Sequence, residues 1–429
     1  MTTLETQPVT IVWRDMSATQ RTRRLPSPKV VVFATMAVRL AWLLTFHLHS
    51  HLVGEHGFNA FPYGGQDDGR YYYETAAKLA DGTQPDYVLN AFPRVLALLM
   101  DLGIRNLLAL KLISYVVSMI SVVLAVTLVL QLTKHLDEMA RRWAVIVVSL
   151  VGGLFPSSIF WSMNSIMRDG WILSFVLIFL WSTSSAAPHL RTWVRIPIGL
   201  VALAAAGAFR FYVVPVALAA LVSSRIDLAN PMRRVKARAI PVLRRLVIVC
   251  VGFILLCLVA APSIEKYAGR NILGWRSRPE FASTGSALGY VFDGENPLVV
   301  VGLYLVSFVS NAVGPLPWQI TSANQLLALS EIPFFIIIGA ALFAADWRAP
   351  LARICGLFGL YWLLLLGLWN DVLGNAARNR INAWPVLAIV AAVALAQSWS
   401  DVSTSEAPVR WGLRQLLPPR SRRRVPVSE

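Results

Sequence analysis

Two adjacent carboxylates, Asp67 and Asp68, are the residues best suited to acid–base chemistry in this chain. They precede Arg70 and Tyr71, and the spacing of the following residues predicts a helix over 70–80. One interpretation is simple capping, because aspartate is favoured at a helix N-terminus. A pair of carboxylates exceeds what one cap requires, and one of them could act as a general base or bind a cation. Asp68, Tyr72, Ala76 and Leu79 are expected on one face of this helix.

Three arginines interrupt or flank apolar segments, where a charge usually faces a cavity or a partner. Arg210 lies inside the apolar run 196–222, and it could bind a phosphate or extend its side chain to the membrane surface. Arg378 and Arg380 are two positions apart, so on an extended segment they would point to opposite faces. Only one of them need contact a ligand, and we favour Arg380 because it is nearer the following apolar run.

Other polar residues have simpler expected roles. Arg168 and Asp169 are adjacent at an expected helix start, where we expect them to neutralise each other rather than to act in catalysis. Glu331 lies near the start of an apolar run, where capping is favoured and pairing with an arginine or binding a cation is the alternative. The tyrosines at 71–73 are expected to be interfacial anchors. The cysteines lie within apolar runs and show no spacing typical of a metal site or a disulfide framework.

The segments that must position these residues are apolar and long enough to cross a membrane. The chain is 56% hydrophobic and 14% charged, with a mean hydropathy of +0.59, and is therefore far more apolar than a soluble domain. Runs of about 20 apolar residues predict transmembrane helices. We therefore predict one all-α, polytopic transmembrane bundle, with spans near 30–48, 105–132, 143–162, 170–186, 246–264, 329–345, 354–369 and 382–398.

Two further apolar stretches decide the number of crossings, which we expect to be 10–11. A single crossing of 196–222 would place the most basic loop outside, so we expect a hairpin of two short helices with Arg210 at its outer bend. The run 298–313 ends in Gly314-Pro315, which breaks a helix and indicates a re-entrant segment or an outward-facing turn. Counting it as a full span would give eleven crossings and would place the two basic tails on opposite sides of the membrane, so we prefer ten.

The positive charge of the chain indicates its orientation. Lys and Arg exceed Asp and Glu by 16, and the basic residues gather in the tail 1–29, in the middle loop 225–245 and in the tail 399–429. Such clusters mark the cytoplasmic side of a membrane protein, beside anionic lipid headgroups. We therefore expect both termini in the cytoplasm, membrane lipids as partners, and no nucleic-acid partner.

The membrane domain is expected to span 30–398 and to present two long loops outside, 49–104 and 265–297. The first of these loops is acidic overall and should contain short amphipathic helices. No organelle or retention signal is present, and a bacterial plasma membrane is the expected location of this multi-pass protein.

Several motifs together resemble the GT-C membrane glycosyltransferases, which include lipid A aminoarabinose transferases and protein O-mannosyltransferases. Those enzymes commonly carry Asp-Glu-x-x-Tyr or a related acidic pair in the first outer loop, and Asp67-Asp68-Gly69-Arg70-Tyr71 resembles it with Asp in place of Glu. The resemblance covers most of 30–398 and continues with Phe92-Pro93, Phe155-Pro156-Ser157, Trp161-Ser162 before Arg168-Asp169, Phe209-Arg210-Phe211-Tyr212, and Arg378-Asn379-Arg380 before Trp384-Pro385.

The resemblance implies an inverting transferase with an active site facing outside. It would take a sugar from a polyprenyl-phosphate donor and pass it to a hydroxyl of a glycan, lipid or protein acceptor, in the synthesis of cell-envelope glycan or glycolipid. Asp67 matches the first acid of the family pattern and would be the base, with Asp68 as the cap. The donor phosphate would be bound by Arg210, Arg378 and Arg380, because guanidinium groups pair with phosphate bidentately.

Supporting roles in such a site would fall to Arg70, Tyr71, Arg168, Asp169 and Glu331. The sequence leaves open whether a divalent cation such as Mg²⁺ or Mn²⁺ is a cofactor.

Two other functions are alternatives to the transferase. A polysaccharide polymerase or ligase acting on undecaprenyl-diphosphate glycans would also use arginines, but its main catalytic loop is expected late in the chain. A transporter or lipid flippase should show paired repeats and broken helices at mid-membrane, and the sequence shows no such repeat.

Overall fold

The structure is a computed structural model of the chain, and every regular element that it describes is a helix. The described residues are 25–58, 68–85, 88, 90–184, 191–225, 252–253, 288, 296–320, 328–347, 349–370 and 372–404. The α-helices are α2 (Pro28–Leu52), α3 (Asp68–Ala80), α4 (Phe92–Asp101), α5 (Leu107–Leu132), α6 (Glu138–Val147), α7 (Pro156–Ser162), α8 (Asp169–Thr183), α9 (Thr192–Phe209), α10 (Val213–Arg225), α13 (Pro297–Val313), α15 (Ile332–Ala344), α16 (Pro350–Trp369), α17 (Leu373–Asn379) and α18 (Trp384–Thr404). A π-helix, η1 (Val148–Gly153), and the 3₁₀ turns η2 (Pro317–Gln319), η3 (Leu329–Glu331) and η4 (Arg380–Asn382) complete the set.

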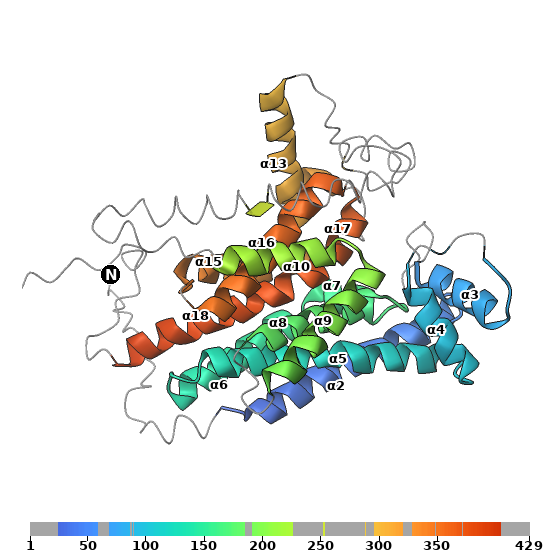
Figure 1. The fold of residues 1–429 in the computed structure, drawn as a ribbon, viewed down its shortest axis with the longest axis horizontal. Helices are drawn as coiled ribbons and strands as arrows, with labels where there is room; N and C mark the ends of the chain where they lie inside the picture. The colour runs from blue at the N-terminus through green and yellow to red at the C-terminus, as the bar shows by residue number, and fades with distance from the viewer. Residues whose placement is uncertain are drawn as a thin grey trace, which may run out of the picture.

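Helices long and apolar enough to cross a membrane run through this bundle (Figure 1). Within the described residues four single helices meet that test, namely α2, α5, α9 and α16. Two bent pairs of helices raise the number to six if each pair is one span; their bends are 46° after η1 and 51° after η4. The helices α8, α10, α13 and α15 are apolar but shorter. These features fit a multi-pass membrane protein.

The predicted positions of most spans coincide with helices of the structure. The run predicted at 170–186 is α8, for example, and the run at 382–398 is α18, which continues to Thr404. The tails up to residue 24 and from 405 lie outside the described residues, as do nearly all of the span at 246–264 and of the outer loop at 265–297. The number of ten crossings therefore stays a prediction.

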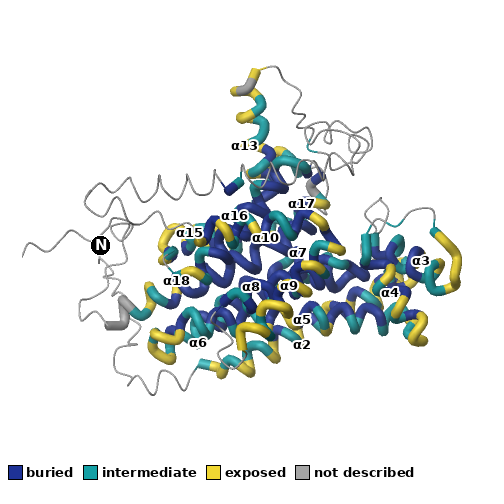
Figure 2. The backbone as a smooth tube through the Cα atoms, viewed as in Figure 1, coloured by how far each residue is buried: buried dark blue, intermediate teal, exposed yellow. Residues whose placement is uncertain are grey.

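The bundle buries most residues of some helices and exposes one side of others (Figure 2). Helix α18 packs against α6, α15 and α16, and its residues from Val386 to Ala392 are all buried. Large apolar side chains elsewhere point outward, including Phe33 on α2, Val201 on α9 and Phe343 on α15. A wide apolar exterior of this kind suits lipid tails rather than water.

The predicted hairpin around Arg210 is present as two helices that contact each other. Helix α9 ends at Phe209 and α10 begins at Val213, and the backbone of Arg210 between them is extended, with φ −153° and ψ 100°. Farther along the chain, α13 ends at Val313, immediately before the expected break at Gly314-Pro315.

The two short helices expected in the first long loop are α3 and α4, which pack against each other at one end of the bundle (Figure 1). Helix α3 begins at Asp68, two residues before the predicted start at Arg70, and ends at Ala80 as predicted. Its buried face contains Gly69, Tyr72, Thr75 and Ala76. Tyr72 and Ala76, which were predicted to share one face, are therefore buried together, whereas Leu79 is only half-buried.

Candidate functional site: a buried cluster of charges

Asp169, the first residue of α8, is the centre of a group of buried charges. Its Oδ2 accepts a hydrogen bond from Nε of Arg378 at 2.6 Å, and its Oδ1 forms an ion pair with Nη2 of Arg210 at 3.1 Å. The expected neutralisation by the adjacent Arg168 is therefore not the main contact of this carboxylate. Its ionic partners come instead from the α9–α10 bend and from α17.

Arg378 connects this carboxylate to the first long loop. Its Nη1 is hydrogen-bonded to Oδ2 of Asp68 at the start of α3, and its Nη2 donates to the hydroxyl of Tyr72 at 3.4 Å. One buried guanidinium thus contacts two carboxylates that are far apart in the sequence. The contact also places the predicted acidic motif beside the predicted basic motif.

Helix α3 approaches the rest of the molecule closely because its second residue is glycine. A Cβ atom added to Gly69 would overlap the side chain of Ser165 and would lie 3.0 Å from the backbone nitrogen of Ile166. Real Cβ atoms are almost never that close to other atoms. The glycine therefore allows Asp68 to reach Arg378 from a helix that sits directly on the segment before α8.

Arg210 and Arg168 bring two further positive charges to the site. Arg210 is hydrogen-bonded to the amide oxygen of Asn379, and its guanidinium lies 5.7 Å from the ring centre of Tyr212. Arg168 donates from Nη1 to the carbonyl of Phe209 at 2.9 Å, and its guanidinium lies 5.7 Å from the ring centre of Tyr72.

We call Asp68, Arg168, Asp169, Arg210 and Arg378 the charge cluster. Three arginines face two aspartates in it, so its described members carry one net positive charge. Two donors beside it, Nε of Arg168 and the hydroxyl of Tyr212, are buried and have no hydrogen-bond partner among the described residues. A buried donor without a partner is costly in free energy. An anion bound there would be stabilised because its charge offsets the net positive charge of the cluster and its oxygen atoms accept hydrogen bonds from these donors.

The environment of Asp68 keeps this carboxylate ionised. Burial alone would raise the pKa of Asp68, but the charge and hydrogen bond of Arg378, with a smaller contribution from Arg168, hold that pKa below its ordinary value. The side chain of Asp68 is 41% exposed, so a molecule entering from the loop side can reach the carboxylate.

Arg380 does not join the charge cluster. It is completely buried, and its Nη1 forms an ion pair with Oε2 of Glu331 at 2.9 Å. Its Nε donates to the carbonyl of Asn311 at 2.7 Å, its Nη2 donates to that of Ser310 at 3.3 Å, and the ring of Phe335 lies 5.5 Å away. Every nitrogen of this guanidinium has a protein partner.

Glu331 is also engaged on both oxygens. Its Oε1 accepts from the backbone nitrogen of Ser157, in the first turn of α7, at 2.7 Å. The expected cap on its own helix is not made, because no side-chain cap is present at the start of α15. The alternative interpretation, pairing with an arginine, describes the observed contact. We call Arg380 and Glu331 the closed pair.

The remaining predicted site residues lie at the edge of the charge cluster or outside the described residues. Arg70 forms a 2.8 Å ion pair with Glu55, both partly exposed, and Tyr71 packs edge-on against Tyr72 with ring centres 5.6 Å apart. Asp67 is among the residues that the structure does not describe.

Some residues of the site were assigned other roles from the sequence. Tyr72 was expected to be an interfacial anchor, yet it is buried under Arg168 and Arg378. Its position four residues after Asp68, one helical turn on, is the signal that could have revealed this. Asn379 lies between the two arginines of the basic motif, and no pattern in the sequence indicates that it binds Arg210.

A divalent cation does not fit the charge cluster. Within the described part of the chain, no three His, Cys, Asp or Glu residues come together as a candidate metal site. Guanidinium groups contact both oxygens of Asp169 and Oδ2 of Asp68, so a cation would have to displace them to bind these carboxylates. We therefore assign no step of the chemistry to a metal.

In comparisons with protein-family models, curated proteins and solved structures, the chain matches none of them. Its function is therefore inferred from its own residues and from how they are arranged.

Proposed function

We propose that this protein is a membrane glycosyltransferase of the GT-C type, which transfers a sugar from a polyprenyl-phosphate donor to an acceptor hydroxyl with inversion. The observation that carries this proposal is the charge cluster, in which an exposed carboxylate and three arginines meet at helix ends. That combination supplies the two groups that the reaction needs, a base for the acceptor and cations for the departing phosphate.

The donor phosphate is a diester with one negative charge, which matches the single net positive charge of the described cluster. Its two free oxygens can accept from guanidinium nitrogens of Arg378, Arg210 and Arg168, since planar guanidinium groups bind phosphate bidentately. The partnerless Nε of Arg168 and hydroxyl of Tyr212 are further donors within the same group.

The reaction needs one proton transfer and one displacement. An aspartate removes the proton of the acceptor hydroxyl, and the acceptor oxygen forms a bond to the anomeric carbon of the sugar. The bond from that carbon to the phosphate oxygen breaks, and its electron pair remains on the polyprenyl phosphate, whose increased charge the arginines stabilise. Attack from the face opposite the phosphate gives inversion.

We propose Asp68 as this base, because it is the described carboxylate of the cluster that is partly exposed. In the structure it is held by Arg378, which lowers its pKa. When a phosphate accepts from Arg378 and shares its charge, that lowering weakens and Asp68 becomes a better proton acceptor. Donor binding would thus prepare the base. Asp67, which the family pattern favours, is the adjacent candidate.

The contacts change our choice between the two arginines of the basic motif. Both arginines have protein partners for all of their nitrogens. One partner of Arg378 is the partly exposed carboxylate of Asp68, in a cluster with a surplus of positive charge, whereas Arg380 is fully buried against Glu331 and two carbonyls. We therefore assign phosphate binding to Arg378, together with Arg210, and assign Arg380 a structural role.

The decisive experiment is a transfer assay with the purified full-length protein and polyprenyl-phosphate monosaccharides, in which release of polyprenyl phosphate is measured. Asn caps helices as well as Asp but cannot take a proton. We expect Asp68→Asn to leave folding intact and to lower turnover by about 10²–10⁴-fold, the usual contribution of a positioned base.

Two further variants complete this test. Asp67→Asn identifies the base if Asp68→Asn remains active. Asp81→Asn is the matched control, because Asp81 follows the same helix and pairs with Arg105 in an exposed position; its turnover should be normal. Full activity of both Asp67→Asn and Asp68→Asn would remove the proposed catalytic role.

A further inference from the structure

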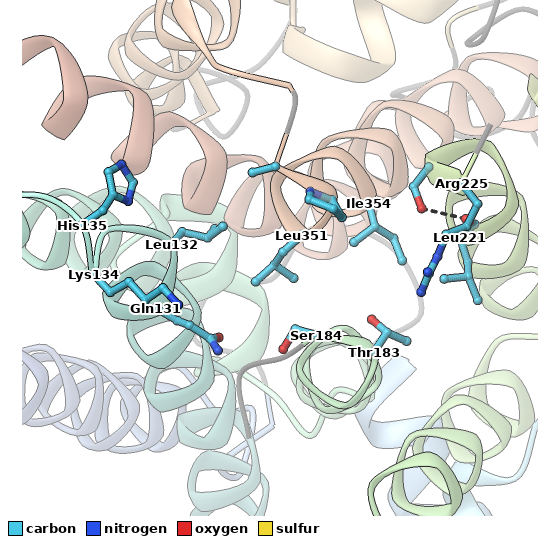
Figure 3. Close-up of a pocket in the computed structure, with 13 residues that line it drawn as sticks. Gln131, Leu132, Lys134, His135, Thr183, Ser184, Leu221, Arg225, Leu351 and Ile354 are labelled. Carbon is cyan, nitrogen blue, oxygen red and sulfur yellow. Dashed lines mark hydrogen bonds between the residues drawn. The ribbon is translucent and has the colours of Figure 1, made fainter. Parts of the chain in front are cut away.

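A second polar site lies where α5, α8 and α10 end and α16 begins. It is a pocket of about 440 Å³. In Figure 3 Lys134 and His135 lie on one side of it and Arg225 on the other, with Leu351 between them. The volume is in the range of small-molecule binding pockets.

The pocket is separate from the charge cluster. Asp169 of the cluster is the first residue of α8, whereas Ser184 of the pocket directly follows that helix. At 1.5 Å per residue, the two sites are about 22 Å apart along this helix. Helix α10 shows the same separation, since it starts beside Arg210 and ends at Arg225. Ligand binding in this pocket therefore does not depend on the proposed transferase reaction.

The charges that line the pocket are all basic. Lys134 and Arg225 are exposed cations, His135 lies beside them, and none of the described residues that line the cavity is acidic. Helix C-termini carry partial negative charge, but nearby arginines bind carbonyls there. Arg195 donates to the carbonyl of Ser184 at 2.6 Å, and Arg353 donates to that of Ser224 at 2.9 Å. The pocket therefore favours an anion.

The rest of the lining suits an amphipathic ligand. Leu132, Leu221, Leu351 and Ile354 supply an apolar wall. The side-chain oxygen of Gln131 is buried and has no hydrogen-bond partner among the described residues, so it can accept from a hydroxyl group. A ligand with one phosphate, a hydroxyl-bearing headgroup and an apolar body would satisfy all of these surfaces together.

We propose that this pocket binds the headgroup of an anionic phospholipid, of the phosphatidylglycerol kind, from the cytoplasmic leaflet. The predicted orientation supports that leaflet, because Arg225 begins the basic stretch 225–245, which the charge distribution places in the cytoplasm. Basic pockets between helix ends on that side of a membrane recognise anionic headgroups through charge and shape.

Lipid binding to the full-length protein in detergent can be measured by native mass spectrometry, with phosphatidylglycerol as the probe and phosphatidylcholine as the neutral comparison. Each basic residue near a headgroup commonly contributes about fivefold to affinity, the factor that corresponds to about 1 kcal/mol. The double variant Lys134→Gln/Arg225→Gln should therefore bind phosphatidylglycerol about 25-fold more weakly.

The matched control is Lys29→Gln/Arg191→Gln. It removes two exposed cations that do not line the pocket, at the starts of α2 and α9. This control should keep the affinity for phosphatidylglycerol within about twofold of wild type, because the affected charges are screened from the pocket by solvent and salt. Equal losses in both double variants would show general surface attraction and would overturn the proposal.

Two further arms test the pocket and the ligand. Leu351→Trp keeps every charge but fills the cavity, so a folded Leu351→Trp protein should also lose phosphatidylglycerol; unchanged binding would place the lipid elsewhere. Inorganic phosphate should not displace the lipid, since it cannot use the apolar wall. Displacement by phosphate alone, or equal binding of phosphatidylcholine, would contradict a phospholipid site.

Discussion

Arg378 and Arg380 stand two positions apart on one short segment, and their surroundings differ in a way that separates a binding site from a structural one. Arg380 forms the closed pair with Glu331, and all its nitrogens have protein partners. The nitrogens of Arg378 also have protein partners, but one of these is the partly exposed carboxylate of Asp68. Arg378 belongs to the charge cluster, which has more cations than anions and donors without partners beside it. Both arginines are buried and carry the same charge. The surplus of positive charge and the buried donors without partners around Arg378 are therefore what distinguish a candidate ligand site.

The largest expected effect comes from breaking the closed pair. Arg380→Met should lower the free energy of unfolding by about 3–5 kcal/mol, because it leaves the charge of Glu331 buried and unpaired. Thermal unfolding of the purified protein in detergent would show the loss as a lower midpoint. The double variant Arg380→Met/Glu331→Gln should recover part of it, since a neutral amide can still accept from Ser157. No recovery in the double variant would contradict this account of the pair.

Lysine substitutions test whether phosphate binding distinguishes Arg378 and Arg210 from Arg380. They keep the positive charge but remove the planar guanidinium group and its paired donors. Arg378→Lys and Arg210→Lys should each weaken use of a polyprenyl-phosphate donor by about ten- to a hundredfold, the range that corresponds to about 1.5–3 kcal/mol for a charge-assisted contact. Arg210→Ala should be weaker still. Arg380→Lys should lower the unfolding midpoint instead and leave the KM for the donor near that of wild type. Normal donor kinetics in Arg210→Ala would reassign Arg210 as a membrane-interface anchor.

The smallest expected effect is a dependence of stability on pH. Because the pKa of Asp68 is lower in the folded protein than its ordinary value of 3.8, its ion pair contributes stability above about pH 4 and loses it as pH falls through the folded-state pKa. The difference in unfolding midpoint between wild type and Asp68→Asn should be constant from pH 7 to about pH 5 and should shrink below that. A difference that grows on acidification would show that Arg378 does not hold Asp68 as an ion pair.

The helical elements could largely be predicted because their signals are local. Run length and hydropathy indicate the spans. The periodic segment after the acidic pair indicates α3 to within two residues of its start, and the charge of Arg210 within an apolar run indicates the bend between α9 and α10. Each of these features depends on residues close together in the sequence, so no knowledge of the fold is needed to recognise it.

The partners within the site could not be predicted in the same way. Asp169 was paired with its neighbour Arg168 because nothing in the sequence connects it to Arg378, which is 209 positions away. The preference for Arg380 over Arg378 rested on its nearness to the following span, and the two side chains were expected to diverge on an extended segment. That segment is helical, in α17 and η4, and nearness to a span does not show which arginine faces Asp68 and Asp169. Tyr72 was assigned to the interface because tyrosines are common there, and only the packing of α3 shows it to be buried.

The long separation between Asp169 and Arg378 also bears on how the protein is made. At about 5–20 residues per second, the 209 positions between them take about 10–40 s to synthesise. During that interval Arg210, which emerges soon after Asp169, is the available ionic partner for the newly inserted α8. We therefore expect the hairpin of α8, α9 and α10 to assemble first around Asp169 and Arg210. The charge cluster would be completed only when the C-terminal helices are inserted, so its full set of ion pairs would form only when synthesis is nearly finished.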